Sequence, residues 1–249
     1  MPPREHHALK DHKARSMQLK SSESVSERVY QRLKNDIFDF KLMPAERFTE
    51  SELATAYAVS RTPIRQALYR LQQEGYVEVS FRSGWQIRPL NFQYYEQLYD
   101  VRILLEQHAV QILCQQQAQA RDSRQILPAL QPLFETWMIE PAQYLRDLKT
   151  LSQLDEDFHC QLLQAAGNRE MARIHLELSE KIRIIRRLDF LKADRIQATY
   201  AEHQQLLQLI LAQDSVQALA HLEAHIRHSR DAVRQISLEI LSTAQYAEG

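Results

Sequence analysis

Glycine and cysteine are both scarce in this sequence of 249 residues, which contains only 4 Gly and 2 Cys. Leu, Ala, Gln, Glu and Arg are abundant instead, and because these residues favour α-helix we expect a mainly helical protein. Cys114 and Cys160 are too few and too far apart for a disulfide framework or a cysteine-based zinc site. We expect both to be reduced thiols in the helices of a cytoplasmic protein.

Long apolar runs and a strong net charge are also absent. No stretch is long enough to span a membrane, and residues 1–24 lack the apolar core of a signal peptide, so we expect a polar, disordered tail and no membrane partner. The formal net charge is −1, so a surface that binds nucleic acid has to be local. The length and the 44% hydrophobic content suit two globular domains.

Helix signals begin after the tail. Apolar residues at helical spacing predict a first helix over residues 25–40. Thr49 and Glu52 have the spacing of a capping box, which predicts a short second helix. Thr62 followed by Pro63 predicts the N-cap and first residue of a third helix. Two short helices joined by a brief turn are typical of a helix-turn-helix.

The period of the sequence changes after Gly75. Residues 76–79 and 85–87 alternate between apolar and polar, and the turn residues at 82–84 separate them, which predicts a small β-hairpin. A hairpin directly after the second helix of a helix-turn-helix would be its wing. We therefore predict a winged helix-turn-helix DNA-binding domain over residues 25–90.

Helical periodicity continues from residue 91 to residue 249 with short interruptions, which predicts an antiparallel all-helical bundle. The expected helices cover residues 91–117, 122–138, 142–166, 168–190, 195–212 and 214–242. The predicted N-caps are Asn91, Asp122, Asn168 and Asp214, and Gly167 is the expected stop of the third helix.

The residues suited to contact DNA lie at the start of the third helix and in the wing. In a helix-turn-helix the N-terminal residues of the second helix reach base edges in the major groove, and arginine is the commonest specific reader of guanine. The candidates are Arg61, Thr62, Arg65 and Gln66 on the helix, with Arg82 and Gly84 at the tip of the wing. On pattern alone, an ordinary solvated helix face with surface arginines is an equal alternative.

Four residues in the helical half could hold a metal ion. Asp155 and His159 are four residues apart, so they share one helix face, and His203 and His225 each fall within the apolar stripe of a later helix. A carboxylate and three imidazoles that converge inside a bundle form a reasonable divalent-metal site. Each histidine alone could equally be a hydrogen-bonded core residue, and the Asp155–His159 pair could be a structural hydrogen bond.

A family resemblance narrows these alternatives for the first half of the chain. Residues 60–65, Ser-Arg-Thr-Pro-Ile-Arg, strongly resemble the winged-helix signature of the GntR family of regulators, and the resemblance covers residues 25–90. It implies that Arg61 and Arg65 contact the operator and that Gly84 approaches it. One departure is Ser51, where the fatty-acid-responsive member carries a further DNA-contacting arginine, so its operator sequence cannot be transferred.

The second half resembles the FCD domain, the helical effector domain of the FadR-type subgroup of GntR regulators. The matching segments are Asp100-Val101-Arg102 with Glu106, Asp155-Glu156-Asp157-Phe158-His159, Ala166-Gly167-Asn168, Glu202-His203 and Asp214…Ala218…His225-Ile226. Position by position, the resemblance implies the metal ligands Asp155, His159, His203 and His225. Members that bind acyl chains without metal lack this set, which argues against an acyl-CoA effector.

The resemblance also implies an effector. Zinc is the first choice of metal, with nickel or manganese as alternatives, and the open coordination positions would accept a small carboxylate. Arg102 is either a clamp for that carboxylate or the ion-pair partner of Glu106, one helical turn later.

These observations predict a transcriptional regulator that binds a near-palindromic operator as a homodimer and is controlled by a small carboxylate. A regulator that senses the metal itself is one alternative. A metal-dependent hydrolase is a weaker one, since no general base or nucleophile motif accompanies the ligands and the winged helix would have no purpose. We therefore do not expect an enzyme.

Overall fold

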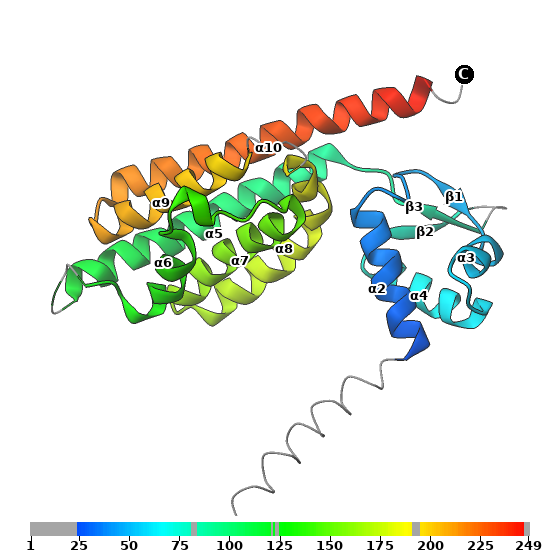
Figure 1. The fold of residues 1–249 in the computed structure, drawn as a ribbon, viewed down its shortest axis with the longest axis horizontal. Coiled ribbons are helices and arrows are strands. Elements are labelled where there is room, and N and C mark those ends of the chain that lie inside the picture. Colours follow the sequence, from blue (N-terminus) through cyan, green and yellow to red (C-terminus); the bar gives the residue numbers. More distant parts are fainter. Residues whose placement is uncertain (1–23, 81–83, 121, 123–124, 191–194, 247–249) are drawn as a thin grey trace, which may run out of the picture. The chain divides into compact units, whose positions relative to one another are not determined.

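The computed structural model describes residues 24–80, 84–120, 122, 125–190 and 195–246 (Figure 1). The chain divides into two compact units, Met1–Leu90 and Asn91–Gly249.

In residues 24–80 and 84–90, the described part of the first unit, there are three helices and a three-stranded antiparallel sheet. The helices are α2 (Val25–Phe38), α3 (Glu50–Ala56) and α4 (Arg61–Gln73), and the strands are β1 (Arg47–Phe48), β2 (Val77–Ser80) and β3 (Gly84–Ile87). The strand order is β1-β3-β2, so the predicted hairpin carries a third strand, β1, which the sequence pattern did not indicate. This is the predicted winged helix-turn-helix.

Local signals explain where these helices begin. The Thr49 side chain accepts from the backbone N–H of Glu52, and the Glu52 carboxylate accepts from the backbone N–H of Thr49, so the predicted capping box is confirmed. The prediction that Thr62 caps α4 was wrong, because Ser60 occupies the N-cap and Thr62 lies in the first turn. Pro63 is then the third helical residue, where its missing N–H still costs no intrahelical hydrogen bond.

The core of the first unit lies where α2, α4 and the sheet meet. Its fully buried side chains include Leu33, Ile64, Leu68, Leu71 and Val77. At the start of β3 the backbone of Gly84 has a φ of +85°, and a Cβ at this position would lie 2.8 Å from the backbone oxygen of Phe48 in β1. Glycine is therefore required at this position for the sheet itself, whatever it does on DNA.

Gly84→Ala should destabilise the winged unit more than Gly75→Ala. Both glycines have a φ of +85°, so either alanine incurs the left-handed penalty of about 1–2 kcal/mol. Only Gly84→Ala adds a clash with backbone, which should cost roughly 1–3 kcal/mol more, because the added Cβ of Gly75→Ala meets the flexible Arg88 side chain at 3.4 Å. Calorimetric unfolding of the two full-length variants measures the difference, and equal losses would contradict the steric account.

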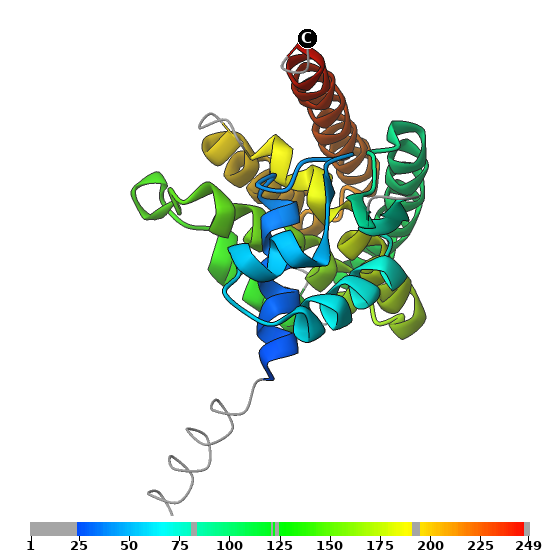
Figure 2. The ribbon, with the colours of Figure 1, turned by 90° about the vertical axis from the view of Figure 1, so that its right-hand side faces the viewer.

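The second unit is an antiparallel helical bundle. It contains α5 (Phe92–Gln119), η1 (Pro128–Leu130), α6 (Gln131–Trp137), η2 (Pro141–Gln143), α7 (Leu148–Ala165), α8 (Arg169–Asp189), α9 (Arg195–Leu211) and α10 (Ser215–Tyr246). The long helices α5 and α10 pack along each other, and α7 packs against α8 (Figures 1 and 2). Within the parts of the chain that the structure describes, no helix is long and apolar enough to cross a membrane.

The prediction of a helix over residues 122–138 was wrong for the first residues of this range. In the described residues of this segment, a 3₁₀ turn begins only at Pro128 and is followed by α6, so Asp122 caps no helix there. Pro128 and Pro132 explain the interruption, because proline is tolerated in the first turn of a helix and not in its interior.

The helix predicted over residues 142–166 begins later than expected. Pro141–Gln143 form a 3₁₀ turn, and α7 begins at Leu148 with Asp147 as the N-cap, whose side chain accepts from the Thr150 backbone N–H. The caps predicted elsewhere in the bundle are confirmed by their hydrogen bonds. Asn91 accepts from Tyr94, Asn168 from Met171 and Asp214 from Gln217, and Gly167 follows α7 with a φ of +83°.

Candidate nucleic-acid interface and candidate metal centre

The first turn of α4 presents the side chains that the sequence suggested for DNA. Arg61 and Arg65 are exposed, with 60% and 52% of their side chains accessible, and Thr62 and Gln66 are exposed beside them. Gln66 accepts a hydrogen bond from the Ser26 hydroxyl of α2. The four residues therefore share one solvent-facing end of α4.

Glu50, the first residue of α3, holds both arginines of this turn. Its carboxylate accepts from Nε and Nη2 of Arg65 at 2.9 and 2.7 Å, and from Nη2 of Arg61 at 3.3 Å. The hydrogen bond from Arg65 is the main cause that lowers the pKa of Glu50 below its ordinary value. Sequence reasoning missed Glu50, although its place beside the capping box sets it at the N-terminal end of α3, opposite the start of α4.

Of the two predicted DNA-contacting residues in the wing, the described residues include one. Gly84 begins β3 and is exposed, as expected for a glycine near the tip of the hairpin. Arg82, the other predicted wing residue, lies outside the described residues.

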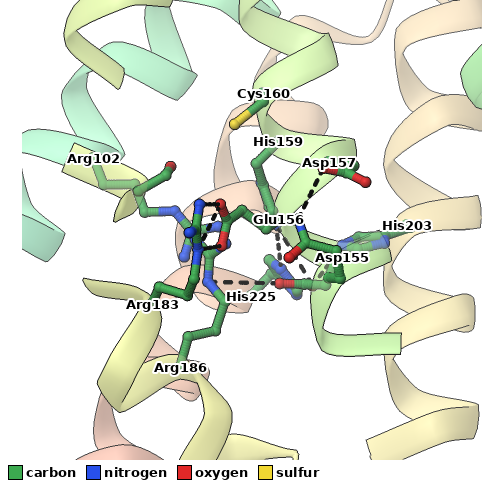
Figure 3. Close-up of polar contacts among 12 residues, drawn as sticks. Arg102, Asp155, Glu156, Asp157, His159, Cys160, Arg183, Arg186, His203 and His225 are labelled. Atoms are coloured by element: carbon green, nitrogen blue, oxygen red, sulfur yellow. Dashed lines mark hydrogen bonds and ion pairs between the residues drawn. The ribbon is translucent and has the colours of Figure 1, made fainter. Parts of the chain in front are cut away.

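In the bundle, the structure brings together the four residues that the sequence suggested as metal ligands. Asp155 and His159 come from α7, His203 from α9 and His225 from α10, and one ligand atom of each lies within 4.8 Å of the others (Figure 3). All four side chains are buried. His221 is only half-buried, and its Nε2 donates to the backbone carbonyl of Glu202 instead, so it lies outside the cluster.

Two carboxylates fix the orientation of two of the imidazoles. Nδ1 of His159 lies 2.6 Å from Glu106 Oε2, and Nδ1 of His225 lies 2.7 Å from Glu202 Oε2. An ionised carboxylate only accepts, so each Nδ1 carries a proton, and in the neutral imidazole, which is the form that ligates a metal, each Nε2 keeps a lone pair. These two Nε2 atoms face each other at 3.2 Å, and lone pairs so close repel unless a cation or proton lies between them.

His203 completes the cluster with a ring that has no hydrogen bond to any described residue. Neither of its ring nitrogens has a partner, and its Nε2 lies 3.4 Å from Asp155 Oδ1. The ring stacks on Phe158 at a centroid distance of 3.8 Å, and the edge of Trp137 packs against it. Aromatic packing therefore holds this imidazole in place while its nitrogens stay available.

The protonation states suit metal ligation. Burial lowers the pKa of His203 well below its usual value, and burial also lowers the pKa of His225 despite its bond to Glu202. Burial alone would raise the pKa of Asp155, but the hydrogen bond and charge of His159, with the charges of His203 and Arg186, hold it well below the usual range. At neutral pH the imidazoles of His203 and His225 are therefore neutral and the Asp155 carboxylate is ionised, and such groups fit a divalent metal ion.

Glu106 on α5 lies behind His159 and contacts three basic side chains. Its Oε1 accepts from Arg102 Nε at 2.6 Å and from His175 Nε2 at 2.8 Å, while Oε2 binds His159. Burial would raise the pKa of Glu106, but the charges of Arg102 and His159 hold it well below the usual range. The structure therefore has the Arg102–Glu106 ion pair, one of the two alternatives open from the sequence, and leaves Arg102 Nη2 without a hydrogen bond in the described chain.

His175 of α8 was not found by sequence reasoning. It lies four residues after Met171 and four before Ser179, both buried, so helical spacing alone would have placed it on the inner face of α8. Nothing in the sequence indicates that it shares a carboxylate with His159, because the two helices meet only in the folded bundle.

Glu106→Gln should destabilise the protein strongly. The change removes the buried negative charge and leaves the buried Arg102 guanidinium uncompensated, which should cost about 3–5 kcal/mol of unfolding free energy. Urea denaturation of the full chain measures it. Glu223→Gln on α10 is the control, since Glu223 pairs with Arg227 near the surface and should change stability little. A Glu106→Gln variant as stable as this control would show that the hydrogen bonds and ion pair of Glu106 contribute little to the free energy of unfolding.

A winged helix-turn-helix joined to a helical bundle with a buried cluster of ligand-type side chains defines a class of protein. It is that of DNA-binding transcriptional regulators that carry a separate effector domain.

Comparison with known proteins gives the family. Residues 25–87 match the profile described as bacterial regulatory proteins, gntR family, and residues 97–228 match the FCD domain. The chain belongs to the GntR family of transcriptional regulators, in the FadR-like subgroup with a C-terminal FCD domain, and it is a regulator rather than an enzyme.

Individual relatives agree with this assignment. The chain is 30% identical over 197 residues to the Nta operon transcriptional regulator of Aminobacter aminovorans, which covers 79% of this chain and 89% of the relative. It is 27% identical over 208 residues to the uncharacterized HTH-type regulator YdhC of Bacillus subtilis, which covers 83% and 90%. A crystal structure of a GntR regulator from Rhodococcus sp. RHA1 has the same fold, with a TM-score of 0.56, 20% identity and coverage of 86% and 98%.

Proposed function

We propose that this cytoplasmic regulator binds a near-palindromic operator as a homodimer, and that a small carboxylate bound at a divalent metal ion in the FCD domain controls this binding. The observation that carries the proposal is the pair of Nε2 lone pairs of His159 and His225, which face each other at 3.2 Å beside Asp155 and His203. A divalent cation is the simplest partner for such an arrangement.

In this proposal the exposed end of α4 reads the operator. Arg61 and Arg65 contact base edges, Thr62 and Gln66 contact bases or phosphates beside them, and Arg82 and Gly84 approach the DNA backbone from the wing. The support is their exposure at the N-terminus of the second helix of the helix-turn-helix, where free backbone N–H groups also suit a phosphate. Glu50 positions the two guanidiniums before DNA arrives.

Arg61→Ala and Arg65→Ala should each remove most sequence preference. Each lost base contact should cost about 1–3 kcal/mol of binding to an operator selected from random DNA, while Arg82→Ala should weaken binding evenly across sequences. Fluorescence anisotropy with operator and scrambled duplexes measures both effects, and two chains should bind per operator, as a homodimer on a near-palindrome requires.

The control for the DNA experiment is Arg173→Ala. Arg173 is an exposed arginine of α8 that pairs with Glu170 and Glu177, and its loss should leave operator binding unchanged. Wild-type affinity and specificity in the Arg61→Ala and Arg65→Ala variants would refute the proposed reading surface. One chain per operator would refute the homodimer.

The metal is proposed to be zinc, with nickel or manganese as alternatives. Three imidazole nitrogens and one carboxylate oxygen suit each of these ions. Such a set leaves one or two coordination positions for the oxygens of a small carboxylate. When bound, the ion would supply a positive charge for the effector, and the chain's own residues would hold and orient both. Arg102, with its free Nη2 beside Glu106, is the proposed clamp from α5.

His203→Ala and His225→Ala should each lower the metal content from about one ion per chain, because each removes one of four ligands. Mass-spectrometric metal analysis of the purified protein measures this. Since burial lowers the pKa of His203 and His225 below 6.5, these ligands stay neutral at pH 6.5, and wild-type protein should lose metal only at lower pH.

His221→Ala and His228→Ala are the matched controls on α10, since neither belongs to the cluster, and both should keep the metal. Metal loss in these controls, or none in His203→Ala, would overturn the ligand assignment. A thermal-shift screen of small carboxylates against metal-loaded protein then distinguishes a regulator controlled by a carboxylate from one that senses the metal itself. Stabilisation by a carboxylate supports the effector proposal, whereas an operator response to metal alone would favour a metal sensor.

A further inference from the structure

Arg186 of α8 is a buried arginine whose guanidinium makes no hydrogen bond to any described residue. Its side chain is 1% exposed, and Nε, Nη1 and Nη2 all lack a hydrogen-bond partner. The nearest carboxylate oxygens are Asp155 Oδ2, 3.8 Å from Nε, and Glu156 Oε2, 3.7 Å from Nη1. A guanidinium carries five N–H donors, and leaving them all unsatisfied in a protein interior is costly.

Two carboxylates near Arg186 already accept hydrogen bonds from other arginines, so Arg186 cannot use them fully. Arg183 makes three hydrogen bonds to Glu156, at 2.6 to 3.1 Å, and Arg102 Nε donates to Glu106. This leaves Asp155 to Arg186, and Asp155 Oδ1 already faces the imidazoles of the metal cluster. Figure 3 shows that Arg186 and His203 both approach the Asp155 carboxylate, Arg186 at Oδ2 and His203 at Oδ1.

The charges around the cluster point to the charge of its occupant. The three buried carboxylates of Asp155, Glu106 and Glu156 balance three guanidiniums, those of Arg102, Arg183 and Arg186. Glu202 at the edge of the cluster is balanced by Arg195, 3.6 Å away. An imidazole has to be neutral to ligate a metal ion, so the rings of His159, His203 and His225 would add no charge to this balance.

A divalent ion therefore brings two uncompensated positive charges into a buried site. Such an excess is unfavourable in a protein interior, and an occupant with two negative charges would neutralise it. A monocarboxylate would neutralise only half of it. All three nitrogens of the Arg186 guanidinium lack a hydrogen bond to the described chain, and its Nε lies 3.8 Å from Asp155 of the cluster.

We propose that Arg186 is a second anion-binding residue of the effector site, and that the effector is a small dicarboxylate. One carboxylate is held at the metal cluster, and the other is held by the guanidinium of Arg186. This inference rests on the proposed function, since it assumes that the FCD domain holds a metal ion. It differs from the Arg102 clamp, because Arg102 has given its Nε to Glu106 and Arg186 has given no donor to any described residue.

The test compares two-, three- and four-carbon dicarboxylates, namely oxalate, malonate and succinate, with acetate and propionate. Isothermal titration calorimetry on metal-loaded, full-length protein should show at least one dicarboxylate binding more than about tenfold more tightly than either monocarboxylate. Arg186→Gln should weaken that dicarboxylate by about tenfold or more, leave acetate nearly unchanged and keep the metal content of the wild type.

Two further variants keep the result interpretable. Arg173→Gln changes an exposed arginine of the same helix and should bind every probe as the wild type does. Arg186→Lys keeps the charge without the planar fork, so it should fold if Arg186→Gln does not, and should bind the dicarboxylate with intermediate affinity.

The failures of the two proposals are distinguishable. Equal binding of mono- and dicarboxylates by the wild type, or an unchanged dicarboxylate affinity in both Arg186 variants, overturns the role of Arg186 and leaves the metal-dependent effector site standing. A wild-type chain that retains no metal, or that binds none of the five probes, overturns both.

Discussion

The buried carboxylate of Glu106 constrains the whole helical unit, because basic side chains from three helices converge on it. Arg102 of α5, His159 of α7 and His175 of α8 each make a hydrogen bond to it. An ionised carboxylate is tolerated in a protein interior only when donors or cations surround it, so these helices have to pack in one register. The same contact places a proton of His159 on Nδ1 and turns its Nε2 toward His225 in the cluster.

Other contacts orient the remaining side chains of the cluster. Glu202 fixes the proton of His225 on Nδ1, and Phe158 holds the ring of His203 by stacking. Asp155 is shared between the imidazoles on one oxygen and Arg186 on the other. A cluster preorganised by its surroundings would need little rearrangement to bind an ion, and in the proposed function a change of occupant would act on the helices that supply the clustered residues and their partners.

The charged side chains of the two units differ in their exposure to solvent. The arginines of α4 are accessible and are held by one carboxylate, Glu50, and in the proposed function DNA phosphates and bases would replace it as their partner. The charged groups of the bundle are buried, so their charges have to be balanced, and the proposed anion would be recognised because it neutralises the charge of the proposed metal ion. An effector controls DNA binding only if it binds two states of the protein differently, and a buried, charge-balanced site is well suited to such a difference.

The sequence by itself determined the helical class, the winged helix-turn-helix, most helix caps and the identities of the four clustered residues. These features depend on period, on neighbours three or four residues apart, or on a short signature such as Ser60 to Arg65. The starts of α6 and α7 were misjudged where prolines interrupt an otherwise helical pattern. Only the tertiary structure decided that Glu106, His175 and Arg186 surround the cluster and that Glu50 holds the arginines of α4. These contacts join residues far apart in the chain, and the local periodicity of a sequence does not indicate which buried charged groups will lie next to each other.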